Sequence, residues 1–203
     1  MGVGASASSL QVGLLKAVSN GNTGGVVVHL QFGADPNFVL VTLQQGAISP
    51  LYLAVLKGHA TIVDLLLKAN ANPDRKCSRQ CDTPLGAAAE RGFINCMKLL
   101  IARGANVNLG DDDGDTPLHM AALKGEAEAA LLLLGNNASP HKRNDKQWTP
   151  LHCACVSGNL AIIIALKAAG ADTHAADIAG LKPAALALAS GHHAAVAILM
   201  AAE

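Results

Sequence analysis

Three aspartates at alternate positions, Asp111, Asp113 and Asp115, have the residue type and spacing that open a calcium-binding loop. Such a loop also needs glycine at its sixth position and glutamate at its twelfth. This chain has Thr116 and Ala122 at those places. The aspartates therefore predict a solvated turn, in which Asp and Gly are common residues, rather than a calcium site.

Cys77 and Cys81 are close enough in sequence to supply two thiolates to a zinc ion. The other thiols do not complete such a site, because Cys153 and Cys155 lie far along the chain in a helical stretch, where a spacing of two points them to different sides. The sequence contains no nucleophile elbow, phosphate loop or paired carboxylates. We therefore predict no metal, no cofactor and no enzymatic activity.

The composition excludes several classes of protein. Among 203 residues, 15 Lys and Arg balance 15 Asp and Glu, which argues against binding to nucleic acid. Hydrophobic residues make up 51% of the chain but aromatic residues only 2%, so we expect closely packed aliphatic helices. Apolar runs fall short of the roughly 20 residues that cross a bilayer, and no secretory signal is visible. The odd number of cysteines, 5, favours a reducing compartment. We expect a cytoplasmic protein, either peripheral to a membrane or part of a large intracellular assembly.

A repeat of about 33 residues organises the chain. A hydroxyl residue, a proline and a leucine recur at Ser49–Leu51, Thr83–Leu85, Thr116–Leu118 and Thr149–Leu151, with a degenerate copy at Lys182–Ala184. The successive prolines are 34, 33, 33 and 33 residues apart, and a glycine follows each of them by eight residues. Such a period indicates stacked structural units.

Two of these copies read Thr-Pro-Leu-His-Met-Ala-Ala, from Thr116, and Thr-Pro-Leu-His-Cys-Ala, from Thr149. They resemble the T-P-L-H-x-A signature of the ankyrin-repeat family. The resemblance extends over nearly everything after residue 9 and implies an all-α repeat solenoid, in which helix-turn-helix units alternate with β-hairpin fingers. It predicts a flexible tail at 1–9 and one ankyrin-repeat domain at 10–203, with repeats at about 10–36, 37–73, 74–106, 107–139, 140–172 and 173–203.

Each conserved-looking position of the repeat has a physical role. Proline in the first turn of a helix loses no hydrogen bond, the Ser or Thr before it can cap free N–H groups, and the later glycine permits a left-handed helix end. The resemblance implies that His119 and His152 stabilise their repeats through hydrogen bonds near the threonine. Tyr52, Gly86 and Ala185 replace this histidine elsewhere, so we expect those repeats to be less rigid.

The segment between successive helix pairs, here called a finger, is unusual in its first copy. From Ala34 to Ser49 it is four residues longer than the regular fingers. Its apolar residues either fold back and extend the core or form an exposed anchor for a partner. These residues are Phe38, Val39, Leu40, Val41 and Leu43.

The next three fingers are basic, acidic and basic in turn. Each could be an ordinary solvated turn, but together the alternating charges would make a binding edge specific. Trp148 is either an exposed hot spot or a residue that packs on the neighbouring repeat. The predicted partner-binding residues of these fingers are Arg75, Lys76, Arg79, Asp111, Asp112, Asp113, Lys142, Arg143 and Trp148. Those predicted on the first helices are Tyr52, Glu90, Arg91 and Lys124.

The two ends of the chain carry separate signals. The first residues fit the M-G-x-x-x-[ST] pattern, which predicts N-myristoylation of Gly2; the alternative is a simple Gly/Ser tail. One myristoyl chain gives only weak membrane association. The last helical stretch, 194–200, lacks the polar outer face of a terminal repeat, which predicts either self-association or inward packing of its apolar residues.

These observations together predict a non-catalytic protein–protein interaction module. It would be an adaptor, scaffold or assembly subunit that binds a partner polypeptide through its fingers and the concave face of the first helices. The alternative is a regulatory inhibitor of an enzyme such as a kinase or phosphatase.

Overall fold

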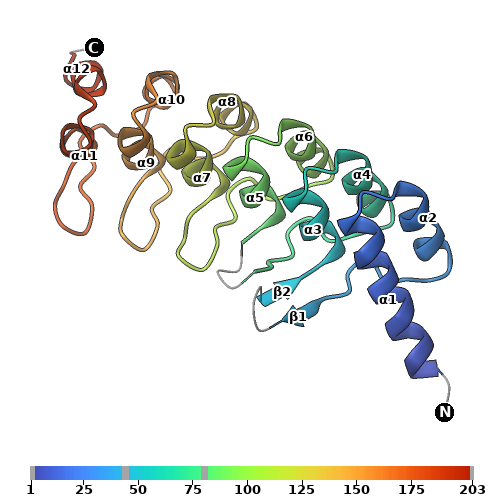
Figure 1. Ribbon diagram of the computed structural model, residues 1–203. Helices are drawn as coiled ribbons and strands as arrows, with labels where there is room; N and C mark the ends of the chain where they lie inside the picture. The colour runs from blue at the N-terminus through green and yellow to red at the C-terminus, as the bar shows by residue number, and fades with distance from the viewer. Residues whose placement is uncertain (1–2, 43–45, 79–81, 202–203) are drawn as a thin grey trace. The chain divides into compact units, whose positions relative to one another are not determined.

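The computed structural model describes residues 3–42, 46–78 and 82–201. Within these residues the chain forms helix pairs separated by long loops, and one pair of short strands (Figure 1). The helices are α1 Val3–Ser19, α2 Thr23–Gln31, α3 Pro50–Leu56, α4 Ala60–Lys68, α5 Pro84–Glu90, α6 Ile94–Ala102, α7 Pro117–Lys124, α8 Ala127–Gly135, α9 Pro150–Ser157, α10 Leu160–Ala168, α11 Pro183–Ala189 and α12 His193–Met200. The strands are β1 Leu40–Thr42 and β2 Gly46–Ile48.

The chain divides into two compact units, although the sequence predicted one domain. Unit 1 comprises Met1–Ala88 and Asn95–Ala105, and unit 2 comprises Ala89–Ile94 and Asn106–Glu203. In unit 1, α1 packs on α2 and α3, and α4 packs on α2 and α3. In unit 2, α9 packs between α7 and α11, while α10 packs between α8 and α12 (Figure 1). First helices thus stack on first helices and second helices on second helices, as the repeat predicts.

The helix starts and ends use the residues that the repeat places there. Ser49 accepts a hydrogen bond from the N–H of Tyr52 at 3.1 Å, and Thr83 accepts one from Gly86 at 2.9 Å. Proline occupies the first turn, where its missing N–H has no helical partner to lose. Gly125 ends α7 with a φ of 75° in the left-handed region, which glycine adopts without strain.

One leucine per repeat forms a regular column of the core. The leucines of the hydroxyl-Pro-Leu triplets are at most 1% exposed; they are Leu51, Leu85, Leu118 and Leu151. Burying such a side chain contributes about 1.5–3 kcal/mol. The last repeat has Ala184 at the equivalent position, and this alanine is only half-buried. The leucine column is therefore interrupted in the last repeat.

Two predicted features differ in the structure. Residues 1–9 were predicted as a flexible tail, but α1 begins at Val3 and is longer than the first helices of the other repeats. The fingers were predicted as β-hairpins, yet within the described residues only the first finger contains strands, with Leu40 paired to Ile48 in antiparallel register. The other fingers are closed by turns that side-chain oxygens stabilise, so they need no strand ladder.

Candidate functional site

The fingers of unit 2 share one side-chain device. Asp111 Oδ1 accepts hydrogen bonds from the N–H groups of Asp113 (3.0 Å) and Asp115 (2.8 Å). Asn144 and Asp177, at intervals of 33 residues, each accept the same two bonds from residues two and four further on, at 2.8–3.0 Å. A side-chain acceptor of this kind fixes a turn without a strand ladder. The Asp111 carboxylate, which we predicted to bind a partner, is therefore used inside its own turn.

Neighbouring fingers of unit 2 are also bonded to one another. Asn144 Nδ2 donates to Asp115 Oδ1 at 2.7 Å, and the N–H of Asp145 donates to the carbonyl of Asp113 at 2.9 Å. One finger further on, Arg143 Nη1 donates to the carbonyl of Ala176 at 2.8 Å. The fingers are therefore held in a fixed relation within this unit.

Trp148 lies between two fingers and is half-buried. Its Nε1 donates to Asp177 Oδ2 at 3.0 Å, its ring stacks on His152 with centroids 6.4 Å apart, and Lys146 Nζ lies 5.5 Å from the ring centroid. Desolvation acts to raise the pKa of Asp177, but hydrogen bonds from Leu181 and Trp148 outweigh it and lower that pKa. The prediction that Trp148 packs on the neighbouring repeat is confirmed, and part of the indole stays accessible.

His119 joins two successive repeats. Its Nδ1 accepts from the N–H of Thr116 at 3.2 Å and lies 2.8 Å from Thr116 Oγ1, while its Nε2 lies 3.0 Å from the carbonyl of Trp148. A carbonyl can only accept, so these partners assign the proton to Nε2. Burial lowers the pKa of the ring, which keeps it neutral. The structural role implied for this histidine is confirmed.

His152 repeats the same arrangement in the next repeat. Its Nδ1 accepts from the N–H of Thr149 at 3.0 Å, and its Nε2 lies 3.3 Å from the carbonyl of Leu181. Burial lowers its pKa as well.

Tyr52 replaces this histidine in unit 1 and makes a related bond. Its hydroxyl donates to Asp82 Oδ2 at 2.8 Å, and Asp82 directly precedes Thr83 as Trp148 precedes Thr149. The expectation that this repeat lacks the connection is therefore wrong. Tyr52 is also only 3% exposed, so it does not belong to the partner-binding surface on which the sequence placed it. Burial and the neighbouring carboxylate raise its pKa above the usual value.

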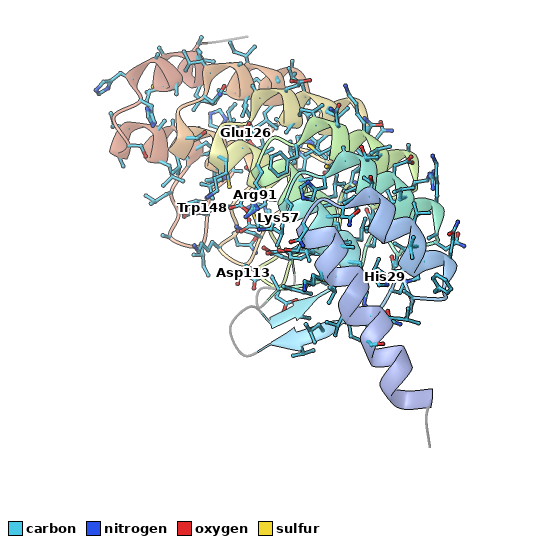
Figure 2. The ribbon with its side chains drawn as sticks, turned by 45° about the vertical axis from the view of Figure 1, so that its right-hand side comes forward. His29, Lys57, Arg91, Asp113, Glu126 and Trp148 are labelled. Carbon is cyan, nitrogen blue, oxygen red and sulfur yellow. The ribbon has the colours of Figure 1, made fainter. Side chains whose placement is uncertain are left out.

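The exposed charges of unit 2 lie on its fingers and at the ends of its first helices. Lys124 Nζ is 3.2 Å from Glu90 Oε1, with both side chains partly exposed, and Arg91 is exposed beside this pair. Figure 2 shows Asp113 toward the fingers and Glu126 toward the helices. The predicted binding residues that the structure places at the surface of unit 2 are Asp112, Asp113, Lys124, Lys142, Arg143, Glu90 and Arg91.

The predicted residues of the first two fingers belong to unit 1 and are less uniform. Phe38 and Val39 are half-buried, whereas Leu40 is 39% and Val41 74% exposed. Ile48 in the paired strand is buried, so the long finger both extends the core and presents apolar side chains. Arg75 is exposed and Lys76 is half-buried. Leu43, Arg79 and Gly2 lie outside the described residues.

The groups that could carry chemistry are buried or dispersed. Cys153 and Cys155 on α9 are at most 2% exposed, and burial raises both pKa values, that of Cys155 to about 12. Such thiols stay protonated and are poor nucleophiles. Across residues 3–42, 46–78 and 82–201, no three His, Cys, Asp or Glu side chains converge as metal ligands. Over the same ranges, no helix has both the length and the apolar character that crossing a bilayer requires.

Sequence reasoning missed the structural role of Asn144 and Asp177. Both lie at intervals of 33 residues from Asp111, and Ser78 precedes it by the same interval and accepts the N–H of Asp82 at 3.4 Å. All four residue types can accept a hydrogen bond from the backbone. The period itself could have revealed these turn residues, had it been applied to the fingers as well as to the helices.

The family model for ankyrin repeats matches this chain in three copies, over residues 14–109, 51–144 and 131–203. With helix pairs that stack as described, these matches extend over most of the sequence, and the chain belongs to the ankyrin-repeat family. Ankyrin repeats are generally protein–protein interaction modules, and the family is typically non-catalytic.

Several curated proteins are similar to parts of this chain. Potassium channel AKT2/3 of Arabidopsis thaliana is 36% identical over 107 residues, which is 53% of this chain and 11% of the channel. Ankyrin repeat and SOCS box protein 6 of Mus musculus is 34% identical over 102 residues, 50% of this chain and 24% of that protein. Putative ankyrin repeat protein FPV014 of Fowlpox virus is 32% identical over 90 residues, 44% of this chain and 20% of that protein. The chain therefore spans at most about a quarter of these relatives.

Proposed function

We propose that this protein is a non-catalytic adaptor or scaffold, and that unit 2 binds a partner polypeptide along a charged edge formed by two fingers. We define the charged edge as the exposed side chains of Asp112, Asp113, Lys142 and Lys146. The single observation that carries the proposal is that two fingers of opposite charge are bonded to each other through Asn144 and Asp145.

Rigid fingers favour binding for an entropic reason. Ordering a loop at an interface costs free energy, and a loop that is already ordered avoids much of this cost. In unit 2 the turn residues and the bonds between fingers supply that order before any partner arrives. The charged side chains between them are left to make contacts outward.

The alternation of sign argues for a polypeptide partner. A nucleic acid would require a surface of mainly positive charge, whereas a folded protein or peptide can present matching charges of both signs. Acidic Asp112 and Asp113 lie on one finger, and Lys142 and Lys146 lie on the next. Trp148, partly accessible beside Lys146, supplies apolar contact area at the same edge.

The proposal is tested with a pair of charge swaps that leave the net charge unchanged. The variant Asp113→Lys with Lys142→Glu reverses both signs of the charged edge, and the control Lys98→Glu with Glu128→Lys does the same at exposed helix positions. Partners are captured by proximity labelling in the native cell and quantified for each variant. We expect the first variant to lose its main partner by about tenfold, equivalent to about 1.4 kcal/mol, and the control to retain it. Equal recovery by both variants contradicts the proposal.

Acylation of Gly2 would add weak membrane attachment to this adaptor role. Intact-mass analysis of the protein from its native cell checks this, because only an acylated chain carries the additional mass. A mass that matches the unmodified polypeptide contradicts it, and the adaptor function then depends on the repeats alone.

A further inference from the structure

A cavity of about 560 Å³ opens in the last repeat, within unit 2. Its walls come from α10, the finger 172–182, and the first and last turns of α11 and α12 (Figure 1). The apolar part of its lining is Ala184, Leu199 and Met200, and the polar part includes Lys167, His174 and Lys182. Sites for small ligands and peptide termini fall in the range of about 300–1,000 Å³, so the cavity is large enough for a few residues.

The cavity lies where the leucine column is interrupted. Four repeats place a fully buried leucine at this position, but the last repeat has Ala184, which lines the cavity and is half-buried. A leucine replaced by alanine leaves a void when the surrounding backbone does not collapse. The space beside Ala184 is therefore suited to an aliphatic side chain from another molecule.

A second departure from the repeat puts a positive charge at the rim of the same cavity. The residue before the proline is a buried Ser or Thr in four repeats, at most 3% exposed, whereas the last repeat has the exposed Lys182. Lys182 makes no side-chain cap bond to α11. Its ammonium group remains available to the cavity that it lines.

Lys167 adds a second ammonium group, which is held in place. Its Nζ donates to the carbonyl of Ile198 at 2.8 Å, and an ammonium group has two further N–H donors. No carboxylate lines the cavity. The nearest one in sequence, Asp172, accepts the backbone N–H of His174 at 2.8 Å within the finger. The polar side of the cavity is therefore a set of donors matched to an anion.

We propose that this cavity binds the C-terminal residue of a partner polypeptide. The aliphatic side chain of that residue fills the space beside Ala184 and Leu199, and its free carboxylate accepts hydrogen bonds from Lys167 and Lys182. The exposed Met200 and Lys182 at the rim leave the preceding residues of the partner a path to solvent. This site is separate from the charged edge and does not depend on it.

The direct test is titration of the full chain with a peptide, Gly-Ser-Gly-Ser-Ala-Leu, carrying a free C-terminal carboxylate. Heteronuclear NMR reports the site itself, through the amide signals of Ala184, Leu199 and Met200. We expect these signals to shift with saturation, and the same peptide with a C-terminal amide to bind about tenfold more weakly or worse, because charge-assisted hydrogen bonds are lost. Free N-acetyl-leucine tests whether a small acid suffices.

Two variants remove the site by restoring the repeat. Ala184→Leu fills the space with the residue that other repeats carry, and Lys182→Thr restores the usual cap residue. We expect Ala184→Leu to abolish peptide binding without lowering the unfolding temperature, and Lys182→Thr to weaken binding about tenfold. Ala189→Leu, at an exposed position of α11 outside the cavity lining, is the matched control and should bind like the unmodified protein.

Several results would overturn the proposal. They are no shift of the three signals with the carboxylate peptide, equal binding of the amidated peptide, unchanged binding by Lys182→Thr, or N-acetyl-leucine binding as tightly as the peptide. If Ala184→Leu fails to fold, the amide comparison and Lys182→Thr still decide the question. The charged-edge swap should leave this peptide titration unchanged, so the two proposals fail independently.

Discussion

The substitution His119→Ala separates the stability that one histidine confers on unit 2 from that of the rest of the repeat. It leaves two polar groups without their partner, the N–H of Thr116 and the carbonyl of Trp148. Each buried group left unsatisfied costs about 1–3 kcal/mol, so we expect a loss of about 2–6 kcal/mol at neutral pH. With a urea m-value of about 3 kcal/mol/M, the unfolding midpoint should fall by about 0.7–2 M.

The same variant should change how stability depends on pH. Burial lowers the pKa values of His119 and His152 below the ordinary 6.5, so the unfolded chain takes up protons first as the pH falls. Their contribution is therefore complete above about pH 6.5 and is lost as the pH falls through the folded-state pKa values. Each histidine adds at most about 1.4 kcal/mol per pH unit, so removing one should reduce the limiting slope by that amount.

The assay is urea denaturation followed by circular dichroism between about pH 7.5 and about pH 5, where the unfolded-state histidine titrates. His141→Ala, at an exposed finger position, is the control and should change stability by less than about 0.5 kcal/mol. An unchanged midpoint for His119→Ala, or identical pH slopes for it and the unmodified protein, would refute the reasoning from these hydrogen bonds.

The remaining predictions concern three other groups. Gly13→Ala should destabilise the protein by about 1–3 kcal/mol, because the added carbon overlaps the ring of His29, whereas Gly135→Ala, with open space around it, should stabilise by up to about 1 kcal/mol; equal midpoints in urea contradict this. The absorbance of the single tyrosine should show no tyrosinate just above pH 10 until the chain unfolds, because burial raises the pKa of Tyr52 and only the unfolded state then loses the proton. Cys153 and Cys155 should resist a thiol reagent in the native protein and react in urea, as their burial and raised pKa values require; rapid labelling of both in the native state, located by mass spectrometry, would contradict this.

The helices were predictable because their signals are local and repeated. Proline, a preceding hydroxyl and a following glycine act within one turn, so a single sequence suffices to place α7 and α9. The binding residues were harder to predict because exposure depends on neighbours in space. Tyr52 looked like a surface residue in place of a histidine, but its hydroxyl reaches Asp82 thirty residues away and its ring is buried. The cavity beside Ala184 required knowing that α12 does not close over it.

The turn residues of the fingers separate what holds the backbone from what a partner would meet. Asp113, Lys146 and Ala179 occupy equivalent exposed places, one after each turn residue, and carry a negative charge, a positive charge and no charge. All three donate the same backbone hydrogen bond, at 2.8–3.0 Å. The unit thus already contains three versions of one position on an unchanged framework. Natural variation or laboratory selection at such positions can alter the specificity of the surface without a cost to folding, which makes unit 2 a template for evolving new recognition.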